Sequence, residues 1–199
     1  KWLVGFSDTT SLLLHSSLKH HVKSIHGPMA YNFKSMNRSV IKNLFALLQG
    51  NMLPIQESYH NLNRLGAVTG IIVGGNLSIL CSLIGSKTLN DLPENIILFI
   101  EDVDEYLYHL ERMMYTLDRS GILKRVKGLI IGQMTNVLDN KMSFGKSPYQ
   151  IINDIIEKYD YPACFNFPIG HTNSNEPIMI GAQVHLEVNN NYSKISYLV

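Results

Sequence analysis

Two residues in this sequence have the types and positions that suit proton transfer. His171 lies in "FNFPIGHTNSN" (165–175), a loop of turn formers that follows a short apolar run, and Glu101 directly follows the apolar strand "NIILFI". In open α/β sheets, functional groups gather beyond the carboxyl ends of the strands, so these side chains meet if their strands are neighbours. A carboxylate that accepts a hydrogen bond from imidazole fixes its tautomer and stabilises the imidazolium formed on proton uptake. The pair therefore predicts acid–base chemistry.

Simpler interpretations exist for both residues. Asp102 and Glu105 fit a D-x-x-E capping box, so "EDVDE" is also explained as the acidic start of a helix. A single histidine in a loop is more often a surface residue than a base. Among the other histidines, His26 is an intermediate candidate because it ends an expected strand just before a Gly-Pro pair.

A histidine–carboxylate pair needs a nucleophile, and Ser7 in "LVGFSDTT" is the candidate that the sequence offers. It follows a strand and begins a helix, as in a nucleophile elbow, and Ser7, Glu101 and His171 repeat the chain order of the α/β-hydrolases. The G-x-S-x-G motif would require glycine at position 9, where Thr9 stands. An ordinary helix N-cap explains Ser7 equally well.

Strand and helix signals alternate along the chain, which predicts an α/β fold of parallel βαβ units with an antiparallel ribbon at the end. Within the helix expected over 102–121, Tyr106, Leu110, Met113 and Leu117 share one face. Expected strands cover 2–6, 22–29, 95–100, 128–134 and 163–167; expected helices cover 8–19, 39–50, 102–121 and 147–159; a hairpin over 178–199 turns at Asn189–Asn191.

Two segments interrupt this alternation. Residues 51–66 are polar and aperiodic, which favours a linker. The stretch "IIVGGNLSIL" carries Gly74 and Gly75, but neither G-x-x-x-x-G-K-[ST] nor G-x-G-x-x-G is present, so a phosphate-binding loop is not indicated. We expect a tight glycine turn there, followed by a short helix capped by Asn76.

The composition narrows the possible functions. Hydrophobic residues make up 45% of the 199 residues and the net charge is +1, so the chain has material for a core and no basic face for nucleic acid. The apolar runs are too short to cross a bilayer, so we expect no membrane partner. Cys81 and Cys164 have no metal-ligand spacing, which favours buried thiols in a reducing compartment.

The motifs, taken together, resemble those of the LD-carboxypeptidases, serine peptidases that include the microcin C self-immunity proteins. The resemblance runs across essentially the whole chain, and the combination of "EDVDE…R" with "PIGH" is its most specific part. It rests on "GFSDTTSLL", "HGPM", "GGNLSIL…LIG", "ILFIEDVDEYLYHLERMMYTLDRSGIL", "GLIIGQM" and "FPIGHTNSN", in that order.

This resemblance implies a flavodoxin-like N-terminal domain and a C-terminal domain of the swivelling β/β/α type, often paired as dimers. Residues 1–50 would then be the tail of the first domain, 51–66 the linker and 67–199 the second domain. The family uses a Ser-His-Glu triad, in which the motifs place Glu101 and His171. The nucleophile would lie in a Gly-rich turn upstream of "GFSDTT", outside a chain that begins in mid-domain, which leaves Ser7 as a helix cap.

The implied activity is hydrolysis of the L-D amide bond of murein tetrapeptides, with release of terminal D-alanine during cell-wall recycling in the cytoplasm. No metal or organic cofactor is implied, and the chain without its nucleophile is expected to be inactive. Two alternatives stay open: a non-catalytic module that binds peptide or dimerises, and a microcin-type peptidase acting on an aminoacyl-nucleotide conjugate. "NEPIMIG" also departs from the family's usual run after the histidine, so the loop there is expected to differ.

Overall fold

A seven-stranded mixed sheet forms the centre of the computed structural model, which describes residues 1–198. Strands β4 to β7 run parallel to one another, and β9 and β10 extend the sheet as an antiparallel hairpin, with β3 at its edge. The α/β class and the terminal antiparallel ribbon are confirmed. In spatial order the strands are β3 (Ile55–Ser58), β10 (Tyr192–Tyr197), β9 (Gln183–Val188), β4 (Gly66–Asn76), β5 (Ile96–Val103), β6 (Val126–Thr135) and β7 (Ala163–Cys164).

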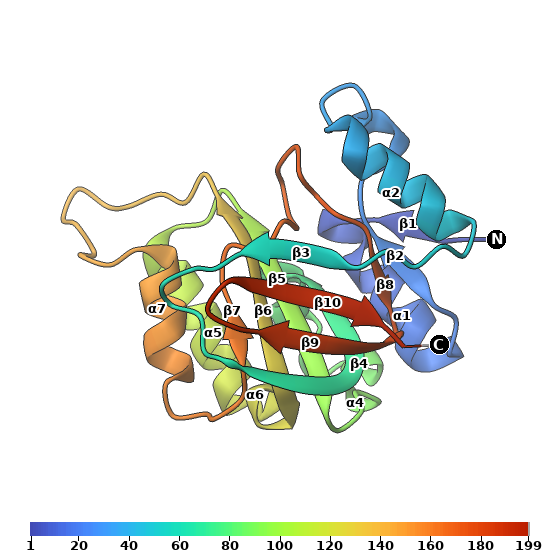
Figure 1. Ribbon diagram of the computed structural model, residues 1–199. Helices are drawn as coiled ribbons and strands as arrows, with labels where there is room; N and C mark the ends of the chain where they lie inside the picture. The colour runs from blue at the N-terminus through green and yellow to red at the C-terminus, as the bar shows by residue number, and fades with distance from the viewer. Residues whose placement is uncertain (199) are drawn as a thin grey trace.

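A second, three-stranded sheet carries the N-terminal part of the chain. Its strands are β1 (Val4–Gly5), β2 (Ser24–His26) and β8 (Ile178–Ile180), of which β1 and β2 are parallel and β8 is antiparallel to β2. The hairpin expected over 178–199 therefore begins later, because β8 joins the small sheet and only β9 and β10 form the hairpin. The N-terminus of the chain lies beside this small sheet (Figure 1).

The helices are amphipathic and bury their apolar sides against the sheets. In α5, the buried side chains include Leu110, Met113 and Leu117, as the spacing predicts, whereas Tyr106 is the N-cap residue and stays 39% exposed. Figure 1 shows α7 and α2 at opposite ends of the molecule. The helices are η1 (Ser7–Thr9), α1 (Thr10–His20), η2 (Ala30–Asn32), α2 (Arg38–Leu48), α3 (Leu77–Ser82), α4 (Lys87–Asn90), α5 (Leu107–Arg119), α6 (Ile122–Arg125) and α7 (Pro148–Ile156).

The segment 51–66 is more structured than a linker. It contains β3, which pairs with β10, and Arg64 forms a bridge with Ala163. These contacts attach it to the edges of the large sheet. The division of the chain at this segment into two domains stays a prediction.

The expected glycine turn is wrong, because Gly74 and Gly75 lie inside β4. Their φ angles are +148° and +150°, a region that side chains with a Cβ rarely adopt. A Cβ on Gly75 would stand 2.5 Å from the side chain of Thr10, so the glycine allows α1 to approach the end of β4. The expected cap is confirmed: the Asn76 side chain accepts a hydrogen bond from the backbone N–H of Ile79.

Candidate active site

Glu101 and His171 lie side by side, although their strands, β5 and β7, are not neighbours in the sheet. His171 Nδ1 is 2.8 Å from Glu101 Oε2. Glu101 is completely buried, whereas 19% of the His171 side chain is exposed. The carboxylate thus stands behind the imidazole, and the imidazole stands between the carboxylate and solvent. Their catalytic role stays a prediction.

Glu101 is not beyond its strand but within β5, at an irregularity in the pairing. Ile100 pairs with Ile131 of β6, whereas Asp102 pairs with Met134, so β6 has an extra residue opposite Glu101. Such bulges change the direction of side chains and are frequent beside active sites. The sequence predicted that this strand ends at residue 100, three residues before its observed end at Val103, because a charged residue is rare in a strand buried on both faces.

The loop after β7 brings His171 across β6 to Glu101. Its backbone is held by Phe167 N–H, which donates to Ile131 O (3.0 Å), and by Gln133 N–H, which donates to Ile169 O (2.8 Å). Gly170 has φ +125°, and a Cβ there would lie 3.1 Å from both Glu101 Cβ and Glu101 Oε2. Glycine before the histidine is therefore required by backbone conformation and by space.

The electrostatic surroundings favour a protonated imidazole. Burial alone would lower the pKa of His171, but the hydrogen bond and the negative charge of Glu101, with Asp102 and Asp104 further away, raise it above the ordinary value. Nδ1–H donates to Glu101 in this arrangement, which leaves Nε2 to take up or release a proton. This is the division of roles that a general base needs.

Asp102 has a different role from its neighbour, and the capping-box interpretation is wrong. Its carboxylate accepts from Asn76 Nδ2 (2.8 Å) and from Ser78 N–H (3.0 Å), so it holds the beginning of α3 rather than of α5. Burial raises the pKa of Asp102 to about 6. Glu105 pairs with His109 on the surface instead.

Ser7 is not the helix cap that the sequence analysis expects. In the described chain its side chain caps neither η1 nor α1, and its φ is +59°, a rare conformation for a residue with a side chain. Ser7 is the first residue of η1, at the sharp turn that follows β1. A strained serine at a strand-to-helix turn is the geometry of a nucleophile elbow.

This turn lies next to the His–Glu pair. The ring of Phe6, the residue before Ser7, is 4.8 Å from the ring of His171 between centroids. Three residues after Ser7, Thr10 Oγ1 accepts from the backbone N–H of Asn76, which pairs with Glu101 across β4 and β5. In the sequence, a serine just after a strand was the sign of such a turn, but Thr9 stands where the G-x-S-x-G motif requires glycine, and this favoured the helix-cap interpretation.

Comparison with known proteins identifies the family. The profile of the LD-carboxypeptidase C-terminal domain matches residues 69–186, more than half of the chain. The chain belongs to the LD-carboxypeptidase family. Within this family, it is 30% identical over 187 residues to a putative carboxypeptidase, slr1534, of Synechocystis, and 28% identical over 199 residues to the murein tetrapeptide carboxypeptidase of Pseudomonas aeruginosa. These alignments cover 94% of the chain but 61% and 63% of the two relatives.

Solved structures of the family have the same fold. The muramoyltetrapeptide carboxypeptidase of Oxalobacter formigenes superposes with a TM-score of 0.89 at 26% identity, covering 99% of this chain and 68% of that one. The microcin C7 self-immunity protein MccF superposes with a TM-score of 0.83 at 20% identity over 100% of this chain and 68% of its own, which shows the shared fold. The chain thus spans about three fifths of the length of the curated LD-carboxypeptidase relatives.

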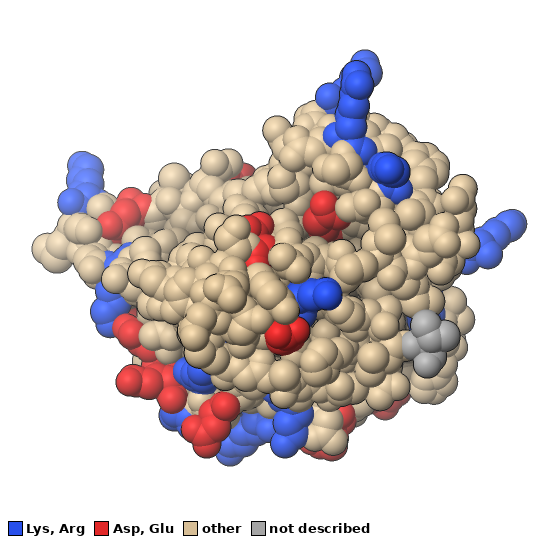
Figure 2. Space-filling model, in the orientation of Figure 1, with Lys and Arg blue, Asp and Glu red and all other residues tan. Residues whose placement is uncertain are grey.

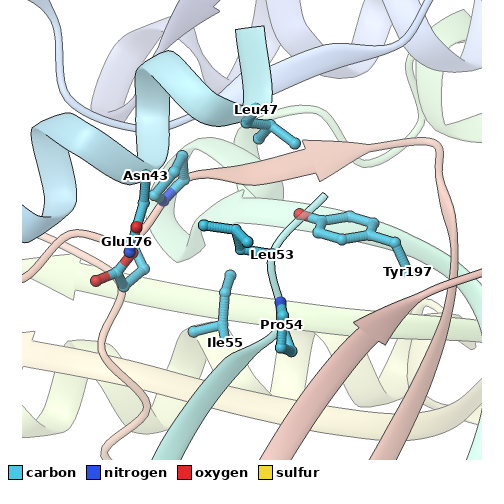
Figure 3. Close-up of a pocket in the computed structure, with 8 residues that line it drawn as sticks. Asn43, Leu47, Leu53, Pro54, Ile55, Glu176 and Tyr197 are labelled. Atoms are coloured by element: carbon cyan, nitrogen blue, oxygen red, sulfur yellow. The ribbon is translucent and has the colours of Figure 1, made fainter. Parts of the chain in front are cut away.

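A groove lies beside the histidine loop of this LD-carboxypeptidase-family chain. It encloses about 440 Å³, and Ser174, Glu176 and Pro168 of the loop form one side of it. Asn43 of α2 donates to Glu176 Oε2 (2.9 Å), and burial raises the pKa of Glu176. A second, smaller pocket adjoins the groove and shares Asn43 and Glu176 with it; Figure 3 shows these two side chains at one end of that pocket and apolar side chains beyond them. Figure 2 shows acidic side chains beside a hollow on this face.

Other kinds of site find no support in residues 1–198. No group of three or more histidine, cysteine, aspartate or glutamate side chains in this part of the chain is arranged to hold a metal ion. Cys164 is buried and Cys81 half-buried, and both are free thiols. None of the described helices is long and apolar enough to cross a membrane.

Proposed function

We propose that this chain is the catalytic part of a serine-type LD-carboxypeptidase, which hydrolyses the amide bond between an L-centre and a terminal D-alanine in murein tetrapeptides. The buried Glu101–His171 pair at the edge of the sheet carries the proposal. Support for the substrate comes from the relatives named murein tetrapeptide and muramoyltetrapeptide carboxypeptidase. The reaction belongs to cell-wall recycling in the cytoplasm, and the enzyme acts as a homodimer.

His171 acts first as general base and then as general acid. Its Nε2 accepts the proton of the serine hydroxyl as the oxygen attacks the scissile carbonyl, and it then gives this proton to the departing amine of D-alanine. A water molecule then attacks the carbonyl of the acyl-enzyme and gives a proton to Nε2 of His171, which returns this proton to the serine oxygen as the ester bond breaks. Glu101 keeps the imidazole in the tautomer that has Nε2 free and stabilises the imidazolium between the steps.

We further propose that Ser7 is the nucleophile. The resemblance implied a serine upstream of the chain, but the positive φ of Ser7, its place between a strand and a helix, and the contact of Phe6 with His171 support Ser7 itself. By analogy with nucleophile elbows, the backbone N–H of Asp8 would help to bind the oxyanion. On this assignment the 199-residue chain contains its own triad, and the expectation that it is inactive would fail.

The test is mass spectrometry of the L-Ala-D-Glu-diaminopimelate-D-Ala tetrapeptide after incubation with the full-length protein or with the 199-residue chain. Ser7→Ala is expected to reduce the release of D-alanine by about 10⁴-fold or more, since removal of a triad nucleophile has effects of this order. Ser11→Ala, one helical turn further along α1, is the matched control and is expected to keep full activity.

Three other outcomes separate the alternatives. If Ser7→Ala keeps activity while Glu101→Gln loses it, Ser7 is not the nucleophile. If the tetrapeptide is not cut but an aminoacyl-sulfamoyl nucleotide is, the protein is a microcin-type peptidase; MccF, a 25% identical relative over 125 residues, favours including this substrate. If neither compound is cut by the full-length protein, the fold serves binding and not catalysis.

A further inference from the structure

His26 is a buried histidine for which the proposed reaction has no use. It ends β2, where it pairs with Ile178 of β8, and none of its surface is exposed. Among the described residues, neither ring nitrogen has a hydrogen-bond partner. A buried polar group without a partner costs about 1–3 kcal/mol, so an imidazole with two such nitrogens needs an explanation.

The surroundings of the ring connect it to the active site. The ring is 5.1 Å from that of Phe99 and 6.2 Å from that of Phe6, between centroids, and Phe6 also contacts His171. Burial lowers the pKa of His26, and His171 lowers it too, whereas Glu101 and the side chain of Asn175 raise it. The charged and polar groups that His26 senses are therefore the two proposed catalytic residues and one amide.

The same small region holds two further polar groups with unused bonding capacity. Glu101 Oε1 is buried and has no hydrogen-bond partner in the described chain, whereas Oε2 binds His171. Asn175 is completely buried, its Oδ1 accepts from Gly170 N–H (3.0 Å), and its Nδ2 has no partner among the described residues.

These unused groups complement one another. A neutral imidazole has one N–H donor and one nitrogen acceptor, the carboxylate oxygen is an acceptor, and the amide Nδ2 is a donor. If His26 donates to Glu101 Oε1 and accepts from Asn175 Nδ2, directly or through one water, all three groups are satisfied. The chain of bonds would run from His171 through Glu101, His26 and Asn175 to Gly170, the residue that precedes His171.

We infer that His26 and Asn175 are positioning residues that fix the Glu101 carboxylate behind His171 and tie it to the backbone of the histidine loop. The inference rests on the proposed acid–base role of His171. A carboxylate held at both oxygens cannot rotate away from the imidazole, so the catalytic hydrogen bond is kept ready. Partners that hold a ligand from behind are commonly worth about 10–100-fold in activity at metal sites, and we expect an effect of that size here.

The test uses His26→Phe, which keeps an aromatic ring but removes both nitrogens, and His26→Gln, which keeps a donor and an acceptor. Two quantities are measured on the full-length protein: kcat and KM for the tetrapeptide, and the far-downfield proton resonance of His171 Nδ1–H, assigned by its loss in His171→Gln. His26→Phe is expected to lower kcat about 10–100-fold, with KM nearly unchanged, and to broaden this resonance. His26→Gln is expected to recover most of both.

Phe99→Leu is the matched control, because it disturbs the packing of the His26 ring without removing a hydrogen-bonding atom. It is expected to lower the unfolding midpoint and to leave the resonance sharp. Equal broadening in Phe99→Leu and His26→Phe, or an unchanged resonance and kcat in folded His26→Phe, would overturn the inference. If His26→Phe does not fold, Asn175→Leu makes the same test from the other side of His26.

The two readouts distinguish this inference from the proposed function. A protein that cuts no substrate, but whose His171 resonance is present in the wild type and broadened in His26→Phe, would remove the function and keep the positioning role. An active protein whose kcat and resonance are both unchanged in His26→Phe would keep the proposed function and remove the positioning role of His26.

Discussion

His171 Nδ1 and Glu101 Oε2 are 2.8 Å apart, although their strands, β7 and β5, are separated by β6. The loop after β7 spans this gap by bonding to β6 on the way, and the bulge at Glu101 lets the carboxylate meet it. The contact therefore depends on the register of three strands. It holds the imidazole in one tautomer, and this is the property that a substitution of Glu101 changes most directly.

Glu101→Gln is expected to reduce kcat by about 10³–10⁴-fold, as loss of the orienting carboxylate does in other triads. The amide can turn its NH₂ group toward Nδ1, which then becomes the acceptor and leaves the proton on Nε2. Release of D-alanine measures the effect. Glu105→Gln is the matched control, because Glu105 pairs with His109 in a histidine–carboxylate contact outside the site, and it is expected to change kcat less than threefold. Equal losses in both variants would contradict the role of Glu101.

The protonation of His171 is expected to occur at a higher pH than that of an ordinary histidine. The hydrogen bond and charge of Glu101 raise the pKa of His171 despite its burial, so NMR titration should give a midpoint above 6.5 in the wild type and a lower one in Glu101→Gln. Because the general base must be neutral, kcat/KM is expected to fall as pH drops through the raised pKa.

The protonation of His171 should also affect the stability of the fold, which is expected to fall as pH rises, whereas kcat/KM is expected to rise. A histidine whose pKa is higher in the folded than in the unfolded state stabilises the fold fully below the unfolded pKa, and this contribution disappears as pH rises through the folded value. Urea unfolding from pH 6 upward should show this loss in the wild type and less of it in Glu101→Gln. If the NMR titration midpoint of His171 in the wild type were at or below its midpoint in Glu101→Gln, both the expected pH dependence of activity and that of stability would be contradicted.

Ser7 is expected to cost stability, as strained residues at functional sites do. With φ at +59°, glycine fits position 7 better than any residue with a Cβ. Ser7→Gly is therefore expected to be more stable than Ser7→Ala by about 1 kcal/mol in urea unfolding, although both lack the hydroxyl and should be inactive.

The control for this comparison is Ser11, which lies inside α1. There the order should reverse, since glycine in a helix is less favourable than alanine by about 1 kcal/mol. If Ser7→Ala is the more stable member of its pair, Ser7 is not strained and the argument for an elbow loses its main support.

Much of the fold follows from local sequence, because helices and strands of the large sheet have clear periodicity. The sequence predicted that Glu101 and His171 would lie at the same edge of the sheet, because the carboxyl ends of parallel strands meet there, but it did not predict that Glu101 lies inside β5 or that the loop after β7 crosses β6. The features that were missed depend on contacts between distant segments. Gly75 lies in a strand, where its lack of a side chain leaves room for α1. Asp102 caps α3, a helix that begins 25 residues earlier in the chain.

Ser7 and His26 illustrate the same limit at the site. A serine between a strand and a helix looks alike in sequence whether it caps the helix or adopts a positive φ. The difference lies in the backbone conformation, which the Gly5–Thr9 turn and the docking of α1 determine. Nor does sequence reveal that His26, Glu101 and Asn175 are all buried with unused hydrogen-bonding atoms, since this depends on how β2, β5 and the loop that holds Asn175 pack.

Gly75→Ala tests whether the close approach of α1 to β4 supports the Ser7 turn. A Cβ at this position would lie 2.5 Å from Thr10, whose hydroxyl accepts from Asn76 N–H, and φ is +150°. Strain and overpacking together should lower the free energy of unfolding by about 2–4 kcal/mol, and the shift of α1 should reduce kcat. Gly85→Ala is the control: φ is +82°, but no atom lies within 4 Å of the added Cβ. It should lose about 1 kcal/mol and keep kcat. Equal losses of stability in the two variants would show that backbone strain alone, and not the contact with Thr10, makes Gly75 necessary.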